Sequence, residues 1–327
     1  MPEPDAAHYL TVADALAKGR VIPFFGAGVN LCDRVEGEAF TPRQGLPSGS
    51  ELAAYLVDYV AELGHEIQEQ DAYDLVRVSQ YVAVMVGDGP LYAELRSLLD
   101  VDYTPLSLHR FFATFQATLQ EKGYPPRPPL LITTNYDDLM ERAFEDAGQP
   151  FDLITYVAEG EHRGKFIHRR PDGSTHLIER PNEYAGIALD DRRQFLHPVV
   201  LKIHGAVDRE DAERDSFVIT EDDYIDYLTR TELASLIPAT LAERLKRSHF
   251  LFLGYGLRDW NLRVILQRVW GQQRLSWQSW AIQRGPSALD RRFWDRRGID
   301  VMDEELKRYI ATLQEHVDGL KPAGGTR

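Results

Sequence analysis

The sequence predicts an α/β fold, a parallel sheet with helices on both faces. Short apolar runs typical of buried strands alternate, along the second half of the chain, with segments whose apolar residues recur every three or four positions. Four strand-like runs end abruptly in small or polar residues. Parallel strands bring such ends to one edge of a sheet, where ligands bind. These runs are Val21–Phe25, Leu130–Thr134, Val199–Ile203 and His249–Leu253.

Helices are predicted for most of the chain up to Lys122. Prolines and glycines over Asn30–Gly49 predict a long loop there, in place of a helix directly after the first strand. Helical periodicity resumes beyond it, with Ser50 expected as an N-cap and Gly64 as a stop. The expected elements are helix Ala7–Gly19, strand Arg20–Phe25, and helices over residues 51–63, Asp71–Val86, Gly89–Leu99 and Ser107–Glu121.

The proline-rich connector Tyr124–Pro129 separates these helices from alternating strands and helices, because proline blocks helix continuation. The charged, glycine-containing segment Ala158–His197 is expected to be a surface excursion with a hairpin at Asp172-Gly173. The expected strands are Leu130–Thr134, Phe151–Val157, Val199–Ile203, Ser216–Thr220, His249–Leu253 and Ser279–Gln283. The expected helices are Asp138–Ala147, Glu221–Leu228, Glu232–Lys246, Asn261–Trp270 and Asp303–Leu320, before a disordered tail.

The composition excludes several classes of protein. No apolar run approaches the ~20 residues that span a bilayer, and the N-terminus is acidic, so a cytoplasmic protein is expected. The formal net charge of -14 argues against nucleic-acid binding by phosphate neutralisation. Cys32 is the single cysteine, which excludes an intramolecular disulfide and a zinc site of several thiolates.

Two of the strand ends carry glycines. Gly26-Ala27-Gly28 follows the first strand, and Gly254-Tyr255-Gly256 follows His249–Leu253. Glycine lets backbone N–H groups approach a phosphate closely, which predicts a nucleotide, although a plain tight turn would use the same residues. The fingerprint of dehydrogenases has a third glycine where Leu31 stands, so hydride transfer is not expected.

The other two strand ends carry side chains suited to catalysis. Thr134-Asn135-Tyr136-Asp137-Asp138 offers three Asn and Asp residues where a helix N-cap needs one, so a cap and a site are both open interpretations. His204 ends its strand; it is a natural general base at neutral pH, although such a histidine is often only a hydrogen-bonded surface residue. The spacing of the other histidines suggests no metal cluster.

Together these pieces resemble the sirtuin superfamily, whose members bind NAD between a Rossmann domain and a smaller module. Gly26-Ala27-Gly28 and Gly45-Leu46-Pro47 are similar to the sirtuin glycine loop and to the start of the flexible loop after it. Asn135 and Asp137 match the T-x-N-x-D motif, and His204-Gly205 matches the catalytic His-Gly. The resemblance implies Asn135, Asp137 and His204 as catalytic residues. The NAD-binding residues that it implies are Gly26, Ala27, Gly28, Asn30, Pro47, Thr134, Gly254 and Tyr255.

The order of the expected helices and strands predicts a division of the chain. Residues 1–49 and 124–300 would form the Rossmann-like NAD-binding domain. Residues 50–123 would form an inserted helical module, and residues 301–327 a C-terminal helix and tail. The C-terminal helix and the arginine-rich segment Arg284–Arg297 are candidate contact surfaces, although aspartates interleaved in that segment also suit a solvated salt-bridge face.

Departures from the deacylating sirtuins narrow the resemblance. No cysteine follows His204, whereas those enzymes usually carry four zinc-binding cysteines there, so no zinc module is expected. Ser48-Gly49-Ser50 replaces their Asp-Phe-Arg after Pro47, and Asn30 replaces a usual serine. With the segment Val218–Tyr224, these features resemble the bacterial sirtuin-like branch whose members hydrolyse NAD in anti-phage defence.

This branch implies an NAD+ hydrolase (NADase) that depletes NAD in abortive infection, with NAD as substrate and no metal. Asp137 would hold the nicotinamide amide, Asn135 would orient the ribose or a water, and His204 would be the general base. Gly254 and the first glycine loop would hold the adenosine and diphosphate. A homo-oligomer is expected, with a hexameric HerA-type ATPase or an Argonaute-type protein as partner and no direct contact with nucleic acid or membrane. Two alternatives are an NAD-dependent protein deacylase and a non-catalytic NAD or ADP-ribose sensor.

Overall fold

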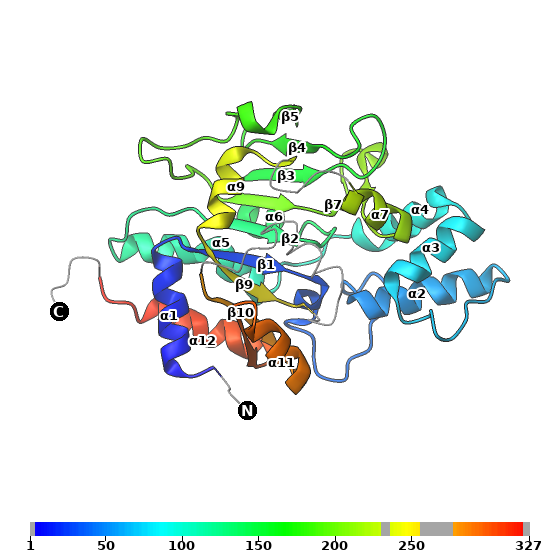
Figure 1. The fold of residues 1–327 in the computed structure, drawn as a ribbon, viewed down its shortest axis with the longest axis horizontal. Helices are drawn as coiled ribbons and strands as arrows, with labels where there is room; N and C mark the ends of the chain where they lie inside the picture. Colours follow the sequence, from blue (N-terminus) through cyan, green and yellow to red (C-terminus); the bar gives the residue numbers. More distant parts are fainter. Residues whose placement is uncertain (1–3, 230–235, 256–276, 323–327) are drawn as a thin grey trace.

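A computed structural model describes residues 4–229, 236–255 and 277–322 (Figure 1). Within them, nine strands form one sheet in the order β11-β10-β9-β1-β2-β6-β3-β4-β5. Neighbours are parallel from β11 to β3, and β4 and β5 add an antiparallel edge. The strands are β1 Val21–Phe25, β2 Leu130–Thr133, β3 Asp152–Tyr156, β4 Phe166–Arg169, β5 Thr175–Ile178, β6 Val199–Lys202, β9 His249–Leu253, β10 Ser279–Gln283 and β11 Ile299–Asp303.

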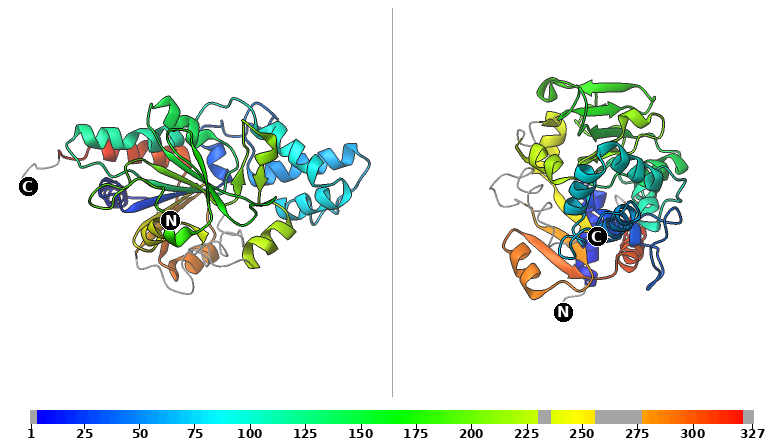
Figure 2. Two further views of the ribbon diagram at one scale, coloured as in Figure 1. Left: turned by 90° about the horizontal axis from the view of Figure 1, so that it is seen from above. Right: turned by 90° about the vertical axis from the view of Figure 1, so that its right-hand side faces the viewer.

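Helices cover both faces of this sheet, as the sequence predicts. In the left view of Figure 2, α5 and α12 lie on one side, and α9 and α11 lie on the other. Two separate hydrophobic clusters correspond to these faces. The helices are α1 Ala6–Ala17, α2 Gly49–Glu62, α3 Leu75–Met85, α4 Asp88–Leu99, α5 Ser107–Glu121, α6 Leu139–Asp146, α7 Glu221–Thr229, α9 Ala239–Lys246, α11 Ala288–Asp295 and α12 Leu306–Asp318.

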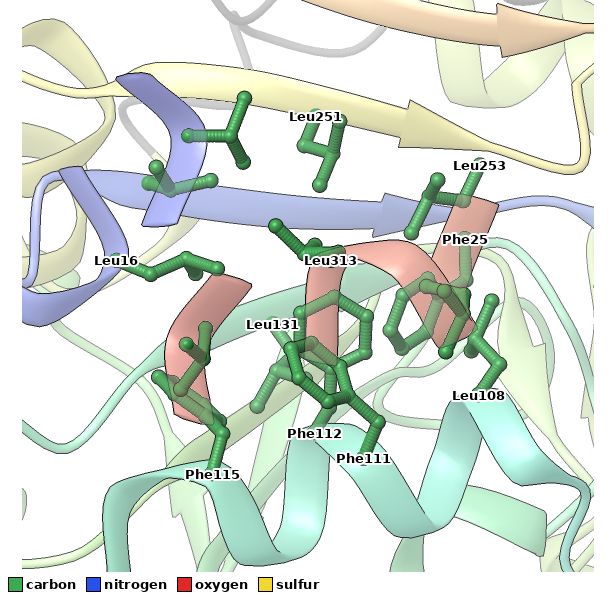
Figure 3. Packing of buried hydrophobic residues seen from close by; sticks show 14 of the residues in the cluster. Leu16, Phe25, Leu108, Phe111, Phe112, Phe115, Leu131, Leu251, Leu253 and Leu313 are labelled. Carbon is green, nitrogen blue, oxygen red and sulfur yellow. The ribbon is translucent and has the colours of Figure 1, made fainter. Parts of the chain in front are cut away.

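The central strands are largely apolar because both of their faces are buried. Phe25 of β1 and Leu131 of β2 pack with Phe112 of α5 and Leu313 of α12 (Figure 3). Phe24 belongs to the cluster on the opposite face. Burying a Leu or Phe side chain contributes roughly 1.5–3 kcal/mol. A parallel strand between two helical layers therefore leaves a continuous apolar run in the sequence.

The helices α2, α3 and α4 lie beside the carboxyl edge, toward which the arrowheads of β1 and β9 point (Figure 1), and their buried residues form a third hydrophobic cluster together with Leu139 of α6 and Phe217. Helix α2 begins with a capping box in which Ser48 Oγ accepts the Glu51 N–H and the Glu51 carboxylate accepts the Ser48 N–H. The prediction of Ser50 as N-cap is wrong, because Glu51 stands three residues after Ser48. Helix α5 packs on the sheet with α6 and α12, and the division into domains stays a prediction.

Three other expectations need correction. The predicted strand Ser216–Thr220 is only β8, Ser216–Phe217, which pairs with β7, Gly205–Ala206, outside the main sheet. Helix α11 and strand β11 were not predicted, because both are short and lie in a charged stretch. Arg284–Arg297 contains part of the core, since Trp294 of α11 is buried. The predicted helix Asn261–Trp270 and the start of the predicted helix Glu232–Lys246 lie outside the described residues.

The topology places a switch point beside β1. The chain leaves β1 to build β2, β3 and β6 on one side, and then adds β9 on the other side. The crevice at the carboxyl ends of such strands is where open α/β sheets bind ligands. Among the described helices, none combines the length and the apolar character that crossing a membrane requires.

Candidate functional site

The glycine loops after β1 and β9 touch each other. The Gly28 N–H donates to the Gly254 carbonyl at 2.9 Å, and the Gly26 N–H donates to the Leu253 carbonyl at 3.0 Å. A Cβ at position 28 would lie 2.6 Å from the Gly254 oxygen, and one at position 254 would lie 2.3 Å from the Val29 nitrogen. Glycine is required because the two backbones meet. Since these two N–H groups already have partners inside the protein, an NAD-binding role of the loops stays a prediction.

The ends of β1, β2 and β6 lie side by side at the same edge. The three strands are in register up to their last residues. Just past the paired residues, the Thr134 N–H donates to the Phe25 carbonyl at the end of β1 at 3.1 Å. In the same way, the Ile203 N–H donates to the Thr133 carbonyl at the end of β2 at 3.1 Å. Asn135 and His204 come next on their strands. The fold therefore brings these two predicted residues to neighbouring positions.

Asn135 and Asp137 differ in their surroundings. Asp137 Oδ1 accepts the Leu139 N–H at 3.1 Å, and so caps α6, whereas Asp138 at the N-cap position makes no side-chain bond to the helix. Asn135 is 8% exposed, and its Oδ1 has no hydrogen-bond partner in the described part of the chain. Asp137 is therefore the residue of this motif that caps the helix, whereas Asn135 Oδ1 is available to bind a group from outside the described part of the chain.

His204 lies between two tyrosines of α7. Tyr224 and Tyr227 set their rings edge-on to the imidazole, with centroids 5.4 and 5.5 Å away. Nδ1 lies 3.5 Å from the Tyr224 hydroxyl, and Nε2 has no partner among the residues described. Burial lowers the pKa of His204 to about 3. The imidazole is therefore neutral at physiological pH, the form that can accept a proton.

Four further predicted residues connect the loops around this edge. Asn30, in the 3-10 helix η1 (Ala27–Leu31), donates from Nδ2 to the Pro47 carbonyl at 3.0 Å and so ties the first glycine loop to the start of α2. Thr134 Oγ1 lies 2.7 Å from the Tyr255 hydroxyl, which joins the ends of β2 and β9. These contacts link the loops that follow β1, β2 and β9.

A cavity of about 320 Å³ lies beside this edge. Its lining includes Asn30 of the first loop, Leu139 of α6, and Phe40, Leu46 and Tyr103. Ligand pockets in proteins typically enclose about 300–1,000 Å³ and combine apolar walls with a few polar groups. The cavity has the size and the mixed lining of such a pocket, but Asn135, Asp137 and His204 are not among its lining residues.

Three predicted residues share one feature. Asn30 Oδ1, Asn135 Oδ1 and His204 Nε2 are all buried without a hydrogen-bond partner within the ranges that the structure describes. Buried polar atoms in proteins are nearly always hydrogen-bonded, so each exception needs an explanation. All three residues follow strands that end at the same edge, and a bound polar ligand there would supply the missing partners. No group of three or more His, Cys, Asp or Glu side chains suited to a metal ion occurs among the described residues.

Comparison with known proteins identifies the family. The SIR2-like domain matches residues 129–302, more than half of the chain. The chain belongs to the SIR2-like family. The match spans β2 to β11 and includes Asn135, Asp137, His204 and Gly254, whereas the glycine loop after β1 precedes it. The sirtuin resemblance of the motifs is thereby confirmed.

This SIR2-like chain is also similar to a curated protein, defense-associated sirtuin 2 of Bacillus subtilis. The two are 22% identical over 92% of this chain. The similarity lies in the sirtuin-like defence branch to which the motifs pointed. The chain spans only 26% of the length of that relative.

Three residues that the sequence did not single out lie against the candidate site residues. Tyr224 and Tyr227 pack on His204, and Lys202 lies behind the Asp137 loop. The i, i+3 spacing of the tyrosines indicates one helix face, but nothing in the sequence places that face against His204. A single lysine inside an apolar strand was the signal for Lys202, because a buried ammonium requires partners.

Proposed function

We propose that this SIR2-like protein is an NAD+ hydrolase that converts NAD+ to nicotinamide and ADP-ribose. One observation carries the proposal: Asn135 Oδ1 and His204 Nε2 are buried at the ends of adjacent strands, without partners among the described residues. An amide oxygen accepts a hydrogen bond from a hydroxyl or a water, and a neutral imidazole takes a proton. These are the two groups that place and deprotonate a nucleophile beside a ribose.

The proposed reaction breaks the bond between ribose C1′ and the nicotinamide nitrogen. The electron pair of that bond goes to the ring nitrogen, and C1′ passes through an oxocarbenium-like transition state. A water held by Asn135 would attack C1′, and His204 Nε2 would take the proton that this water loses. The Asp137 carboxylate would hold the nicotinamide carboxamide. A general base typically contributes 10²–10⁴-fold to the rate, so His204 carries the largest share assigned to one residue.

The residues around the edge suit a dinucleotide. The hydroxyls and carboxamide of NAD would supply partners for the buried atoms of Asn30, Asn135 and His204. The loops of Ala27 and Gly254 follow β1 and β9 at the switch point, where the diphosphate and adenosine of a dinucleotide would lie. NAD would bind at this edge as the substrate.

The experiment that tests the function is incubation of the purified chain with NAD, with and without an acetylated peptide. Hydrolysis predicts nicotinamide and ADP-ribose from NAD alone, at a rate that the peptide leaves unchanged. Turnover that requires the peptide would support a protein deacylase instead. NAD binding without turnover, measured by calorimetry on the same sample, would support a sensor and contradict the hydrolase.

We also propose that the cleavage serves anti-phage defence by depleting NAD, as the effector of abortive infection. The support is the similarity to a protein named a defense-associated sirtuin. Depletion of NAD harms the cell, so activity would depend on assembly with further copies or with a partner, for which a HerA-type ATPase and an Argonaute-type protein are the candidates. Control by self-assembly predicts that nicotinamide release per chain rises with protein concentration; a constant value would contradict it.

Asn135→Ala should lower the rate of nicotinamide release by about 10²-fold, because the water or ribose loses the group that orients it. The melting temperature should change little, since Asn135 Oδ1 has no partner among the described residues and Asp137 caps the helix. Stopped assays of nicotinamide and thermal unfolding measure the two quantities. Full activity with a lowered melting temperature would reassign Asn135 to structure.

A further inference from the structure

A buried cation lies behind the candidate site. Lys202 is the last residue of β6, two residues before His204, and its side chain is 0% exposed. Its ammonium donates to the Asp137 backbone carbonyl and to Glu141 Oε1, the latter at 2.8 Å. A charged amine is rarely buried unless it is paired and hydrogen-bonded, so the arrangement is costly to maintain without both partners.

We propose that Lys202 is a positioning residue of this site. Its ammonium joins the strand that ends at His204 to the loop that carries Asn135 and Asp137, and it supplies the positive charge that faces the Asp137 carboxylate. The inference rests on the proposed function, because it assigns Lys202 to the geometry and charge of the same site. Lys202 touches no substrate in this arrangement and acts through Asp137.

The contacts of the loop after β2 support a role of Lys202 in joining this loop to the strand that precedes His204. The Asn135 N–H donates to Thr133 Oγ1 at 2.9 Å, and Tyr136 donates from its hydroxyl to the Val218 carbonyl at 2.7 Å. The Asp137 carbonyl is held by Lys202. Each residue of the loop is thus fixed by a different neighbour, and Lys202 is the contact that comes from the strand of His204.

The charges around Asp137 support a role of the Lys202 ammonium in setting the pKa of the Asp137 carboxyl. Lys202 faces its carboxylate from β6, Glu141 faces it from α6, and Asp138 faces it from the N-cap position of α6. The Tyr103 hydroxyl interacts with it from the segment before α5. Burial raises the pKa of Asp137 to about 6, Lys202 opposes this rise, and the two acids add to it. Loss of the Lys202 charge and loss of the Glu141 charge should therefore move the titration of Asp137 in opposite directions.

The test compares the pH dependence of kcat/KM for wild type, Lys202→Met and Glu141→Gln. The rate of the wild type should fall as the pH drops through about 6, where Asp137 takes up its proton. His204, with a pKa lowered to about 3, titrates far below this range. Lys202→Met should move the acid limb to higher pH by about 1 unit or more, and Glu141→Gln should move it to lower pH. Lys18→Met, which removes a lysine from an exposed pair with Asp14, is the matched control and should leave the limb in place.

Opposite shifts would support the proposal, because damage to packing moves both variants the same way. Shifts in one direction, or none, would show that Lys202 only fills space. Carboxyl ¹³C NMR of aspartate-labelled protein, with the signal identified by its loss in Asp137→Asn, gives the same comparison without turnover. If wild type releases no nicotinamide, the hydrolase proposal fails while this titration still decides the role of Lys202. If Lys202→Met does not fold, the comparison of wild type with Glu141→Gln decides alone. An Asp137 pKa that Glu141→Gln leaves unchanged would then overturn the proposed role of Lys202.

Discussion

His204→Ala should lower nicotinamide release by 10²–10⁴-fold and leave the chain folded. The reason is that His204 Nε2 has no partner among the described residues, so the protein itself does not use this atom for stability. The Nδ1 atom lies 3.5 Å from the Tyr224 hydroxyl, at the long limit for a hydrogen bond. Nicotinamide release and circular dichroism measure rate and fold on the same sample. A His204→Ala protein that turns over NAD at the wild-type rate would remove His204 from the mechanism.

His168 offers the matched control for this variant. It is a second buried histidine, but both of its ring nitrogens have partners at 2.7 Å, the Asp152 carboxylate and the Tyr184 hydroxyl. His168→Ala should therefore lower the free energy of unfolding by about 1–3 kcal/mol, because a buried acceptor loses its partner. Its kcat should stay close to that of the wild type. The pair of variants separates a histidine that stabilises the fold from one that serves the reaction.

Gly254→Ala should have the largest effect of the predicted variants on stability and on NAD binding. Gly254 has a φ of +72°, and an added Cβ would lie 2.3 Å from the Val29 nitrogen. The left-handed backbone costs alanine roughly 1–2 kcal/mol, and forced overpacking typically costs 1–3 kcal/mol more. The loops after β1 and β9 would separate, and the dinucleotide proposed to lie there would bind more weakly. Thermal unfolding and calorimetric titration with NAD measure both effects.

Gly160→Ala separates the two causes. Gly160 also has a φ of +72°, but a Cβ there would meet nothing within 4 Å. The control should therefore show the backbone cost alone, with unchanged NAD affinity. Equal losses of stability in the two variants would mean that contact between the two loops contributes nothing, and that glycine is needed at position 254 only for its backbone conformation.

The parallel core of the fold was predictable because burial on both faces leaves a local signature. Every residue of β1, β2 and β6 is buried, so each strand is an apolar run that local sequence reveals, except for Thr133 and Lys202 at the ends of β2 and β6. The edge of the sheet lacks this signature. Strand β11 is buried only at alternate positions over most of its length and lies within a charged stretch, so its pairing with β10 is what defines it as a strand. Short elements at an edge depend on non-local partners, which a single sequence does not display.

The candidate site also has a part that local sequence predicts and a part that depends on distant residues. The identities of Asn135, Asp137 and His204, and their places at strand ends, follow from the order of residues along the chain, because residue type and strand ends are local properties. The division of roles between Asn135 and Asp137 is not local. It depends on which side chain reaches the Leu139 N–H, and on Lys202, which comes from another strand to hold the Asp137 carbonyl. The charge on these groups also depends on burial, which many distant residues create together.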